Sequence, residues 1–218
     1  YRQFCERPCF HDGYLPTFNR PNVTLVDTDG KGVERIDETG VWANGEHFEL
    51  DCLVYATGFE VGTDYAQRAG YDVTGRGGLT MTDKWREGAA TFHGFYMRDF
   101  PNLFLVSVVQ SGFSVNFPHM LDEQAKHLAY LFGELRARGA ERVEASQEAE
   151  DGWVNTIVES AQYNVKFLEA CTPGYYNNEG RPAERTVRNG SYGGGSPAFT
   201  RLLAQWRAEG ELAGLEVS

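Results

Sequence analysis

The segment ELDCLVYATGFE ends a run of strand-forming apolar residues with three small ones, Ala56, Thr57 and Gly58. In an open α/β sheet, ligands bind beyond the carboxyl ends of the strands, where small residues let a cofactor approach the backbone. A plain turn at the end of a strand would use the same tripeptide, and the tripeptide alone favours that simpler interpretation. The hydrophobic strand before it and Phe59 after it shift the balance towards a cofactor site.

The strand that would position these small residues is predicted from about His47 to Tyr55. Asn44-Gly45 lies between two strand-like runs and predicts a two-residue hairpin, because both residues accept a positive φ. The run CLVYA is apolar on both alternations, which is typical of a strand covered on both faces in a layered α/β sheet. Two further strands are predicted at Val23–Val26 and Asn102–Val108.

The second half of the chain is predicted to be mostly helical. One helix runs from about Pro118, which suits a first helical turn, to Arg138, and Gly139 ends it. A second covers roughly Ser146–Ala170, and a third begins at Ser196 as its cap and stops at Gly210. A long loop, residues 171–195, lies between the last two helices. The apolar stripe of the first helix is predicted as Leu121, Ala125, Leu128, Phe132 and Leu135.

Composition excludes some classes of protein. The chain has 31 acidic against 20 basic residues, a formal charge of -11, which disfavours a protein that neutralises a nucleic-acid backbone. No apolar run approaches the roughly 20 residues that span a bilayer. The four cysteines include no CxxC pair and predict neither zinc nor a disulfide framework. We therefore expect no metal site and a cytoplasmic location.

Three segments occur in a characteristic order: RPCFHDGYLPTFNRPNVTLVD, ELDCLVYATGFEVGT and KWREGAATFHGFYMRDFPNLFLV. Together with the tail SPAFTRLLAQWRAEGELAGLEV they resemble the C-terminal half of a Baeyer–Villiger monooxygenase. The two glycine-rich dinucleotide fingerprints of that family, and the signature between them, do not occur in this sequence. The chain is therefore expected to be a C-terminal segment whose partner is the N-terminal half of the same enzyme, and to hold FAD poorly alone.

The resemblance implies an α/β fold, the C-terminal part of a flavoprotein with two dinucleotide-binding domains. Strands of the FAD domain would be followed by a mostly helical C-terminal region. Residues 1–12 would end the NADPH-binding domain, and residues 13–138 would form the C-terminal part of the FAD-binding domain. Residues 139–218 would be the helical, substrate-side region, with a mobile loop at 171–195.

The resemblance also implies a reaction. Members of the family convert ketones to esters or lactones with FAD, NADPH and O2, through a flavin C4a-peroxide. Arg7 falls where the family places its catalytic arginine, and a guanidinium stabilises an anion without competing as an acid. The simpler interpretation of Arg7 is an ordinary surface arginine.

The cofactor contacts implied by the resemblance come from two places. Thr57 and Gly58 would let the cofactor approach the strand end, and the loop VVQSGFSVNFPH would line the flavin ring. The helix that follows would direct its partial positive charge at the reduced flavin. Tyr175, Tyr176 and Asn177 stand in a substrate loop where many relatives have a tryptophan. The ring-lining candidates are Gln110, Ser111, Asn116, Phe117 and Pro118.

Two alternatives remain open from the sequence. One is a related flavin monooxygenase that oxidises nitrogen or sulfur. The other is a flavin-free remnant that acts as a binding module, which an acidic composition permits. The residues upstream of this segment would separate the first alternative from a ketone monooxygenase, and flavin colour would separate the second.

Overall fold

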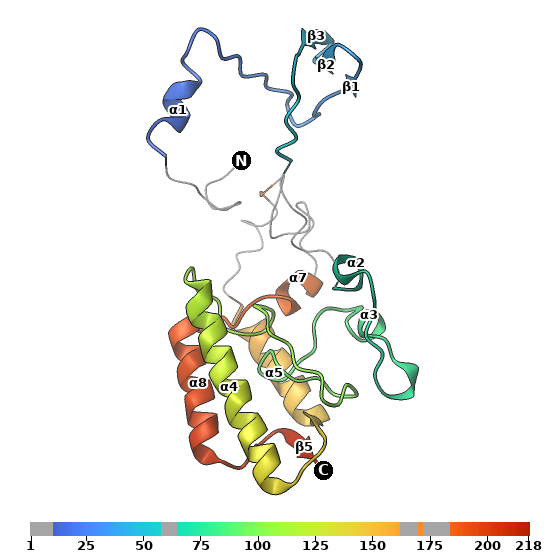
Figure 1. Cartoon of the computed structure of the whole chain (residues 1–218), viewed down its shortest axis with the longest axis vertical. Helices are drawn as coiled ribbons and strands as arrows, with labels where there is room; N and C mark the ends of the chain where they lie inside the picture. The colour runs from blue at the N-terminus through green and yellow to red at the C-terminus, as the bar shows by residue number, and fades with distance from the viewer. Residues whose placement is uncertain (1–10, 58–64, 162–169, 172–183) are drawn as a thin grey trace. The chain divides into compact units, whose positions relative to one another are not determined.

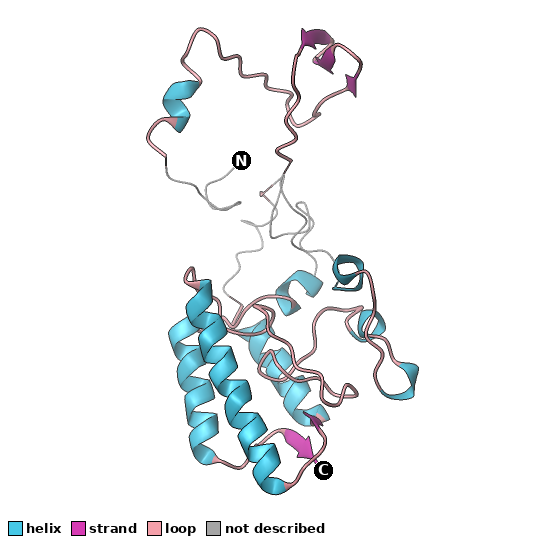
Figure 2. Ribbon diagram, in the orientation of Figure 1, coloured by secondary structure: helices cyan, strands magenta, loops and turns pink. Residues whose placement is uncertain are grey.

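The computed structural model describes residues 11–57, 65–161, 170–171 and 184–218. It contains both helices and strands, coloured separately in Figure 2. The chain divides into two compact units, a smaller one of residues 6–59 and a larger one of residues 60–218 together with 1–5. Each unit is described by itself below.

The smaller unit contains a short helix, α1 (Tyr14–Thr17), and a three-stranded antiparallel sheet. The strands are β1 (Arg35–Ile36), β2 (Gly40–Ala43) and β3 (Glu46–Glu49), in the order β1-β2-β3. Asn44 and Gly45 join β2 to β3 with φ values of 54° and 76°. The predicted hairpin is therefore confirmed.

The strand predicted to run on to Tyr55 is wrong beyond Glu49. Residues 51–57 are irregular, and Val54 and Tyr55 are 78% and 70% exposed. The strand predicted at Val23–Val26 also does not form, and Leu25 is exposed. A strand needs a neighbour to pair with its backbone, and no described residue pairs with either segment as a strand.

The larger unit is built on three helices, α4 (Phe117–Arg138), α5 (Gln147–Glu159) and α8 (Ser196–Glu209) (Figure 1). The helices α4 and α8 pack together, and all three contribute to one hydrophobic core. Strand β4 (Val143–Ala145) pairs antiparallel with β5 (Leu215–Val217). The shorter elements are α2 (Tyr65–Ala69), the 3-10 turn η1 (Arg76–Gly78), α3 (Met81–Lys84) and α7 (Glu184–Arg188). Among the described residues, no helix has both the length and the apolar character that crossing a membrane requires.

Helix α4 confirms its prediction in extent but not in its buried face. Gly139 ends it in the left-handed conformation, with φ 65°. Leu121 and Phe132 of the predicted stripe are exposed. The buried face of α4 differs from the predicted stripe because His127 bonds to Tyr96 and Gln124 bonds to Ser107 inside the unit. The residues buried on α4 are Met120, Gln124, His127, Leu131 and Leu135.

The other predictions for this unit have mixed outcomes. Helix α8 is confirmed with its stop at Gly210, but its cap is Gly195 rather than Ser196. Helix α5 ends at Glu159, and the next two described residues, 160 and 161, are not helical. The helix predicted over roughly Ser146–Ala170 is therefore too long. The strand predicted at Asn102–Val108 is irregular, because no described strand pairs with it.

Cys171 departs from the prediction made from cysteine spacing. Its side chain is 2% exposed, and the residue is disulfide-bonded. Cys52, by contrast, is a free and exposed thiol. The sequence predicts no disulfide framework, and the disulfide at Cys171 departs from that prediction because spacing along the chain does not report which cysteines meet in space.

Two histidines are buried in the core of the larger unit. The Nε2 atom of His127 lies 2.8 Å from the Tyr96 hydroxyl, and the His93 ring stacks on Phe92 with centroids 3.8 Å apart. Burial lowers the pKa of each histidine to about 3. Both are therefore neutral in the folded protein near neutral pH.

This arrangement predicts a loss of stability in mild acid. Because the folded pKa lies below the unfolded value of about 6.5, the unfolded chain binds more protons as the pH falls below 6.5. Each histidine should then cost about 1.4 kcal/mol of unfolding free energy between pH 7.5 and pH 5.5. Urea unfolding of the complete protein at the two pH values measures this loss of unfolding free energy. In His127→Gln the loss should be smaller by about 1.4 kcal/mol, the amount assigned to one histidine.

The matched control is His119→Gln, which changes an exposed histidine on the same helix. It leaves both core histidines in place, so the loss of stability assigned to them should persist. An unchanged pH dependence in His127→Gln would contradict the assignment of this cost to the core.

Candidate functional site

The first turn of α4 is the best-defined part of the predicted flavin-facing loop. Asn116 is its N-cap, and its side-chain Oδ1 accepts a hydrogen bond of 3.3 Å from the amide of His119. Pro118 lies in the first turn, where a missing N–H costs nothing. The amides of a helix start that have no partner in the helix give it a partial positive charge. This end of α4 therefore suits an electron-rich group of a ligand.

Apolar side chains surround that helix start. Phe113, Val115 and Phe117 are 49%, 100% and 43% exposed. Exposed aromatic and branched side chains next to helix amides can cover the face of a flat ligand while the amides meet its polar edge. The described residues therefore fit a ring such as a flavin, which is flat, partly apolar and electron-rich when reduced.

Gly112 fixes how the loop approaches the helices. A Cβ atom on this residue would lie 2.6 Å from Met120 Cε and 2.7 Å from Phe199 Cδ1. Both distances are shorter than real Cβ contacts, so a side chain at this position would displace Met120 or Phe199, and glycine lets the loop pass this close to α4 and α8. Glycine thus allows the loop to turn from the buried interior to the exposed start of α4.

Gln110 and Ser111, both predicted to line the ring, have fully buried side chains. The Gln110 amide bonds to residues of the protein on both its oxygen and its nitrogen. The Ser111 hydroxyl donates to the carbonyl of Ser107 at 2.5 Å and accepts from Nε2 of Gln124 at 3.2 Å. Both side chains are therefore engaged inside the larger unit.

The remaining predicted site residues lie elsewhere. Thr57 is exposed and lies at the end of a described segment of the smaller unit. The other predictions fall outside the described residues, and the structure does not test them: Arg7, Gly58, Tyr175, Tyr176 and Asn177.

Sequence reasoning missed two residues that organise this site. Gln124 lies in the middle of α4, is 1% exposed and donates to Ser107 O at 2.7 Å. Thr91 is fully buried and bonds to Gln110. The only signal for Gln124 in the sequence is its spacing, three residues before His127 on the buried face of α4. No neighbouring residue in the sequence marks Thr91.

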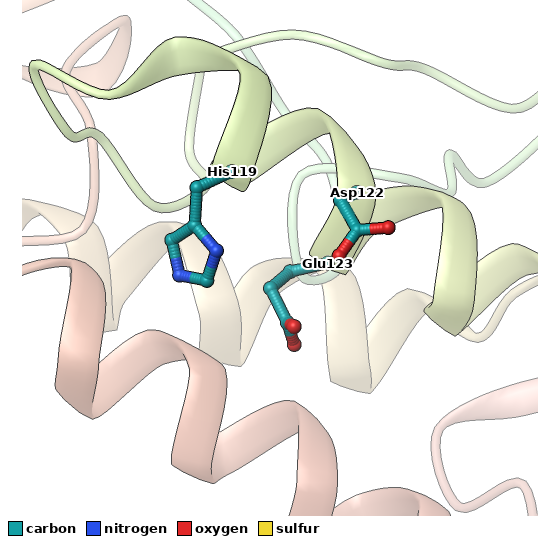
Figure 3. A group of neighbouring side chains, drawn as sticks. All are labelled: His119, Asp122 and Glu123. Atoms are coloured by element: carbon teal, nitrogen blue, oxygen red, sulfur yellow. The ribbon is translucent and has the colours of Figure 1, made fainter.

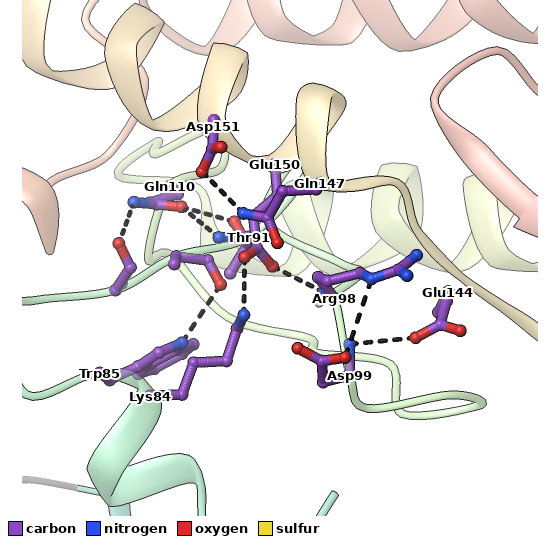
Figure 4. A network of polar contacts seen from close by, with 12 residues as sticks. Lys84, Trp85, Thr91, Arg98, Asp99, Gln110, Glu144, Gln147, Glu150 and Asp151 are labelled. Atoms are coloured by element: carbon purple, nitrogen blue, oxygen red, sulfur yellow. Dashed lines mark hydrogen bonds and ion pairs between the residues drawn. The ribbon is translucent and has the colours of Figure 1, made fainter. Parts of the chain in front are cut away.

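A second polar network holds the loops before Gly112 to the rest of the larger unit (Figure 4). Lys84 Nζ lies 2.7 Å from Glu150 Oε1, and the amide of Arg98 donates to Glu150 Oε2 at 2.7 Å. Burial raises the pKa of Glu150, while the neighbouring Lys84 opposes that shift. Asp99 donates its amide to Glu144 Oε2 at 3.0 Å. These contacts fasten the loops to α5 and β4.

His119, Asp122 and Glu123 bring three possible metal ligands close together on α4 (Figure 3). Lys126 Nζ, however, lies 2.7 Å from Asp122 Oδ2 and 2.8 Å from Glu123 Oε1. The lysine balances part of their negative charge, and we assign no metal to this group.

A surface hollow of about 300 Å³ lies between Val73–Arg76 and Phe100–Leu103. Arg76 is its one charged lining residue, and it pairs with Glu144. None of the predicted site residues that the structure describes lines this hollow, so we do not treat it as the substrate site.

Comparison with known proteins identifies relatives along the whole chain. No family model matches it. It is 53% identical over 219 residues to a pentalenolactone D synthase of Streptomyces exfoliatus, covering 100% of this chain and 38% of that protein. It is 47% identical over 211 residues to a Baeyer–Villiger monooxygenase of Streptomyces coelicolor, covering 96% of this chain and 34% of that protein. The chain thus spans little more than a third of these relatives.

Solved structures agree with the sequence matches. The fold superimposes on a polycyclic ketone monooxygenase from the fungus Thermothelomyces thermophila with a TM-score of 0.89 at 38% identity, over 100% of this chain and 36% of that one. It also matches an oxidised steroid monooxygenase bound to NADP, with a TM-score of 0.80 at 28% identity, over 98% of this chain and 39% of that one.

The relatives and structural neighbours are flavoprotein monooxygenases, and the predicted mixed α/β fold class is confirmed. Within that class the chain is similar along its whole length to Baeyer–Villiger monooxygenases, with whose C-terminal region it aligns. The resemblance seen in the sequence is therefore confirmed.

The cap of α4 generates a prediction. Asn116→Ala removes the side-chain acceptor for the His119 amide and should cost about 1 kcal/mol of unfolding free energy. Amide hydrogen exchange in the first turn of α4 should become faster, because that turn loses a partner.

Ser146→Ala is the matched control, since Ser146 caps α5 through a 3.2 Å bond from the amide of Ala149. It should cost a similar free energy and leave exchange in the first turn of α4 unchanged. Equal exchange in that turn in both variants would contradict a local role for Asn116.

Proposed function

We propose that the chain is the C-terminal part of an enzyme that converts ketones to esters or lactones with FAD, NADPH and O2. The observation that supports this most strongly is the match at 53% identity along the entire chain to a relative of this family. The exposed apolar start of α4 adds a physical reason, because it suits a flat cofactor. The N-terminal part of the same enzyme would be the necessary partner.

FAD and NADPH are the proposed cofactors. One relative of this chain is named an FAD-binding monooxygenase, and one structural neighbour is bound to NADP. Bound FAD, reduced by NADPH, would supply the chemistry that activates O2. We also propose a cytoplasmic location, since NADPH is supplied there.

The residues of this chain would bind and orient the cofactor. Thr57 and Gly58 would allow close approach to the backbone, and the loop from Gln110 and Ser111 to Pro118 would lie along the ring. Asn116 holds the first turn of α4, so that its amides can stabilise negative charge. Phe117, with other exposed apolar residues of the loop, would exclude water from the ring.

Arg7 is the proposed catalytic residue. Its guanidinium stays charged at any working pH and would stabilise negative charge that develops during oxygen transfer. The segment containing Tyr175, Tyr176 and Asn177 would contact substrate. The names of two relatives, a polycyclic ketone monooxygenase and a pentalenolactone D synthase, favour a cyclic ketone as the substrate class.

The complete enzyme tests this proposal. Purified with FAD and NADPH, it should consume O2 in response to cyclic ketones and release one ester or lactone for each ketone consumed. Oxidation of amines or sulfides with no ester from any ketone would overturn the proposal in favour of nitrogen or sulfur oxidation. A protein that shows no flavin absorbance after incubation with FAD and removal of the unbound FAD would overturn the proposal in favour of a flavin-free binding module.

Arg7 gives a separate prediction. Arg7→Lys keeps the charge but loses the planar, forked guanidinium, and should lower the rate of ester formation about a hundredfold or more. Arg86→Lys is the control, because Arg86 is exposed and pairs with Asp83 on the surface. Equal rates in the two variants would show that Arg7 is an ordinary surface arginine.

A further inference from the structure

Gln110 is bonded inside the larger unit through every donor and acceptor of its side chain. Its Nε2 atom donates to the carbonyl of Ala89 at 2.7 Å and to that of Arg188 at 2.9 Å. Its Oε1 atom accepts from the amide of Thr91 at 3.0 Å and from its hydroxyl at 2.6 Å. One amide thus joins two segments that lie about a hundred residues apart in the chain.

The backbone of Gln110 bonds to one of these two segments and also to α5. Its amide donates to the carbonyl of Gly190 at 2.8 Å, and its carbonyl accepts from Nε1 of Trp153 at 2.9 Å. Gln110 therefore grips residues 188–190 both through its side chain and through its backbone. Figure 4 shows the part of this arrangement around Thr91.

Gln110 adopts a conformation that a non-glycine residue rarely takes. Its φ is 53°, in the left-handed region, where a side chain with a Cβ is disfavoured. The surrounding bonds must outweigh that cost, because a buried amide without partners would add a further penalty. Strain that is held by contacts on several sides is typical of a position whose geometry matters for function.

The neighbours of Gln110 extend the connection to α4. The carbonyl of Ser111 accepts from the amide of Tyr192 at 2.9 Å, and the Ser111 hydroxyl accepts from Gln124 of α4. Asn189 Oδ1 accepts a hydrogen bond from the amide of Ala89 at 2.7 Å. This bond directly connects residues 89–91 and 188–190, the two segments to which Gln110 bonds. The segment 188–192 is therefore bonded to the loop before α4 at several points.

We propose that Gln110 is a positioning residue that couples the segment 188–192 to the loop 107–116. Its side chain would act through the backbone that it holds, and not by direct contact with a ring. Loosening either segment would loosen the other and displace the start of α4. The significance for oxygen transfer rests on the proposed function, whereas the coupling itself is a property of the described residues.

Gln110→Met in the complete enzyme tests the coupling, because methionine fills a similar volume without hydrogen bonds. Hydrogen–deuterium exchange should become about tenfold or more faster in two places at once, residues 107–116 and residues 188–192. Exchange in the second half of α8 and in β5 should stay unchanged. Gln205→Met is the matched control, since Gln205 is exposed and bonds only to Glu209 among the hydrogen bonds of the described residues.

Asn189→Ala tests the same coupling with a change in the segment 188–192. It provides the test if Gln110→Met does not fold. It removes the bond from the Ala89 amide and should also speed exchange in residues 107–116. Acceleration confined to one segment, or spread evenly over the whole larger unit, would overturn the proposal in either variant.

A functional readout separates this inference from the proposed function. In Gln110→Met the amount of ester formed per NADPH oxidised should fall several-fold, because a displaced loop shields the cofactor less well. If the parent enzyme makes no ester, the proposed function fails and the exchange result still decides the coupling. If the parent makes ester and the two segments do not loosen together, the coupling fails alone.

Discussion

The larger unit depends on a buried amide that has no spare hydrogen-bonding capacity. The side chain of Gln110 is fully buried and engages Ala89, Thr91 and Arg188 at its two ends. In the low dielectric of an interior, an amide that loses one partner pays a large penalty, so these contacts form together or not at all. The direction in which α4 leaves the loop is therefore set by packing around Gln110, well inside the unit.

Each unit combines hydrogen-bonded polar side chains with apolar residues that remain exposed. In the smaller unit, Asp37 accepts hydrogen bonds from Trp42 and Thr39, which lower the pKa of its carboxyl, while Val54 and Tyr55 are exposed nearby in the sequence. In the larger unit, Val115 is fully exposed at the start of α4. Exposed apolar stretches of this kind mark surfaces that bind other groups.

Local signals predicted the parts of the fold that depend on local physics. The Asn44-Gly45 turn and the stop of α4 at Gly139 follow from conformations that only a few residues tolerate. The strands predicted at Val23–Val26 and Asn102–Val108, and the strand predicted to continue beyond Glu49, do not form, because strand pairing depends on residues distant in the sequence. The buried face of α4 was misplaced because Gln124 acquires partners only in the folded unit. The resemblance to Baeyer–Villiger monooxygenases identified Gln110 as a candidate, but the hydrogen bonds around its side chain could not be read from the sequence.

Trp153 gives the molecule an internal optical reporter. Its indole donates to the carbonyl of Gln110 and stacks on Tyr192, with ring centroids 5.4 Å apart. Indole emission responds to hydrogen bonding and to the polarity of its surroundings. The fluorescence of this side chain therefore contains a signal from the junction between the two segments, and no external label is needed to follow it.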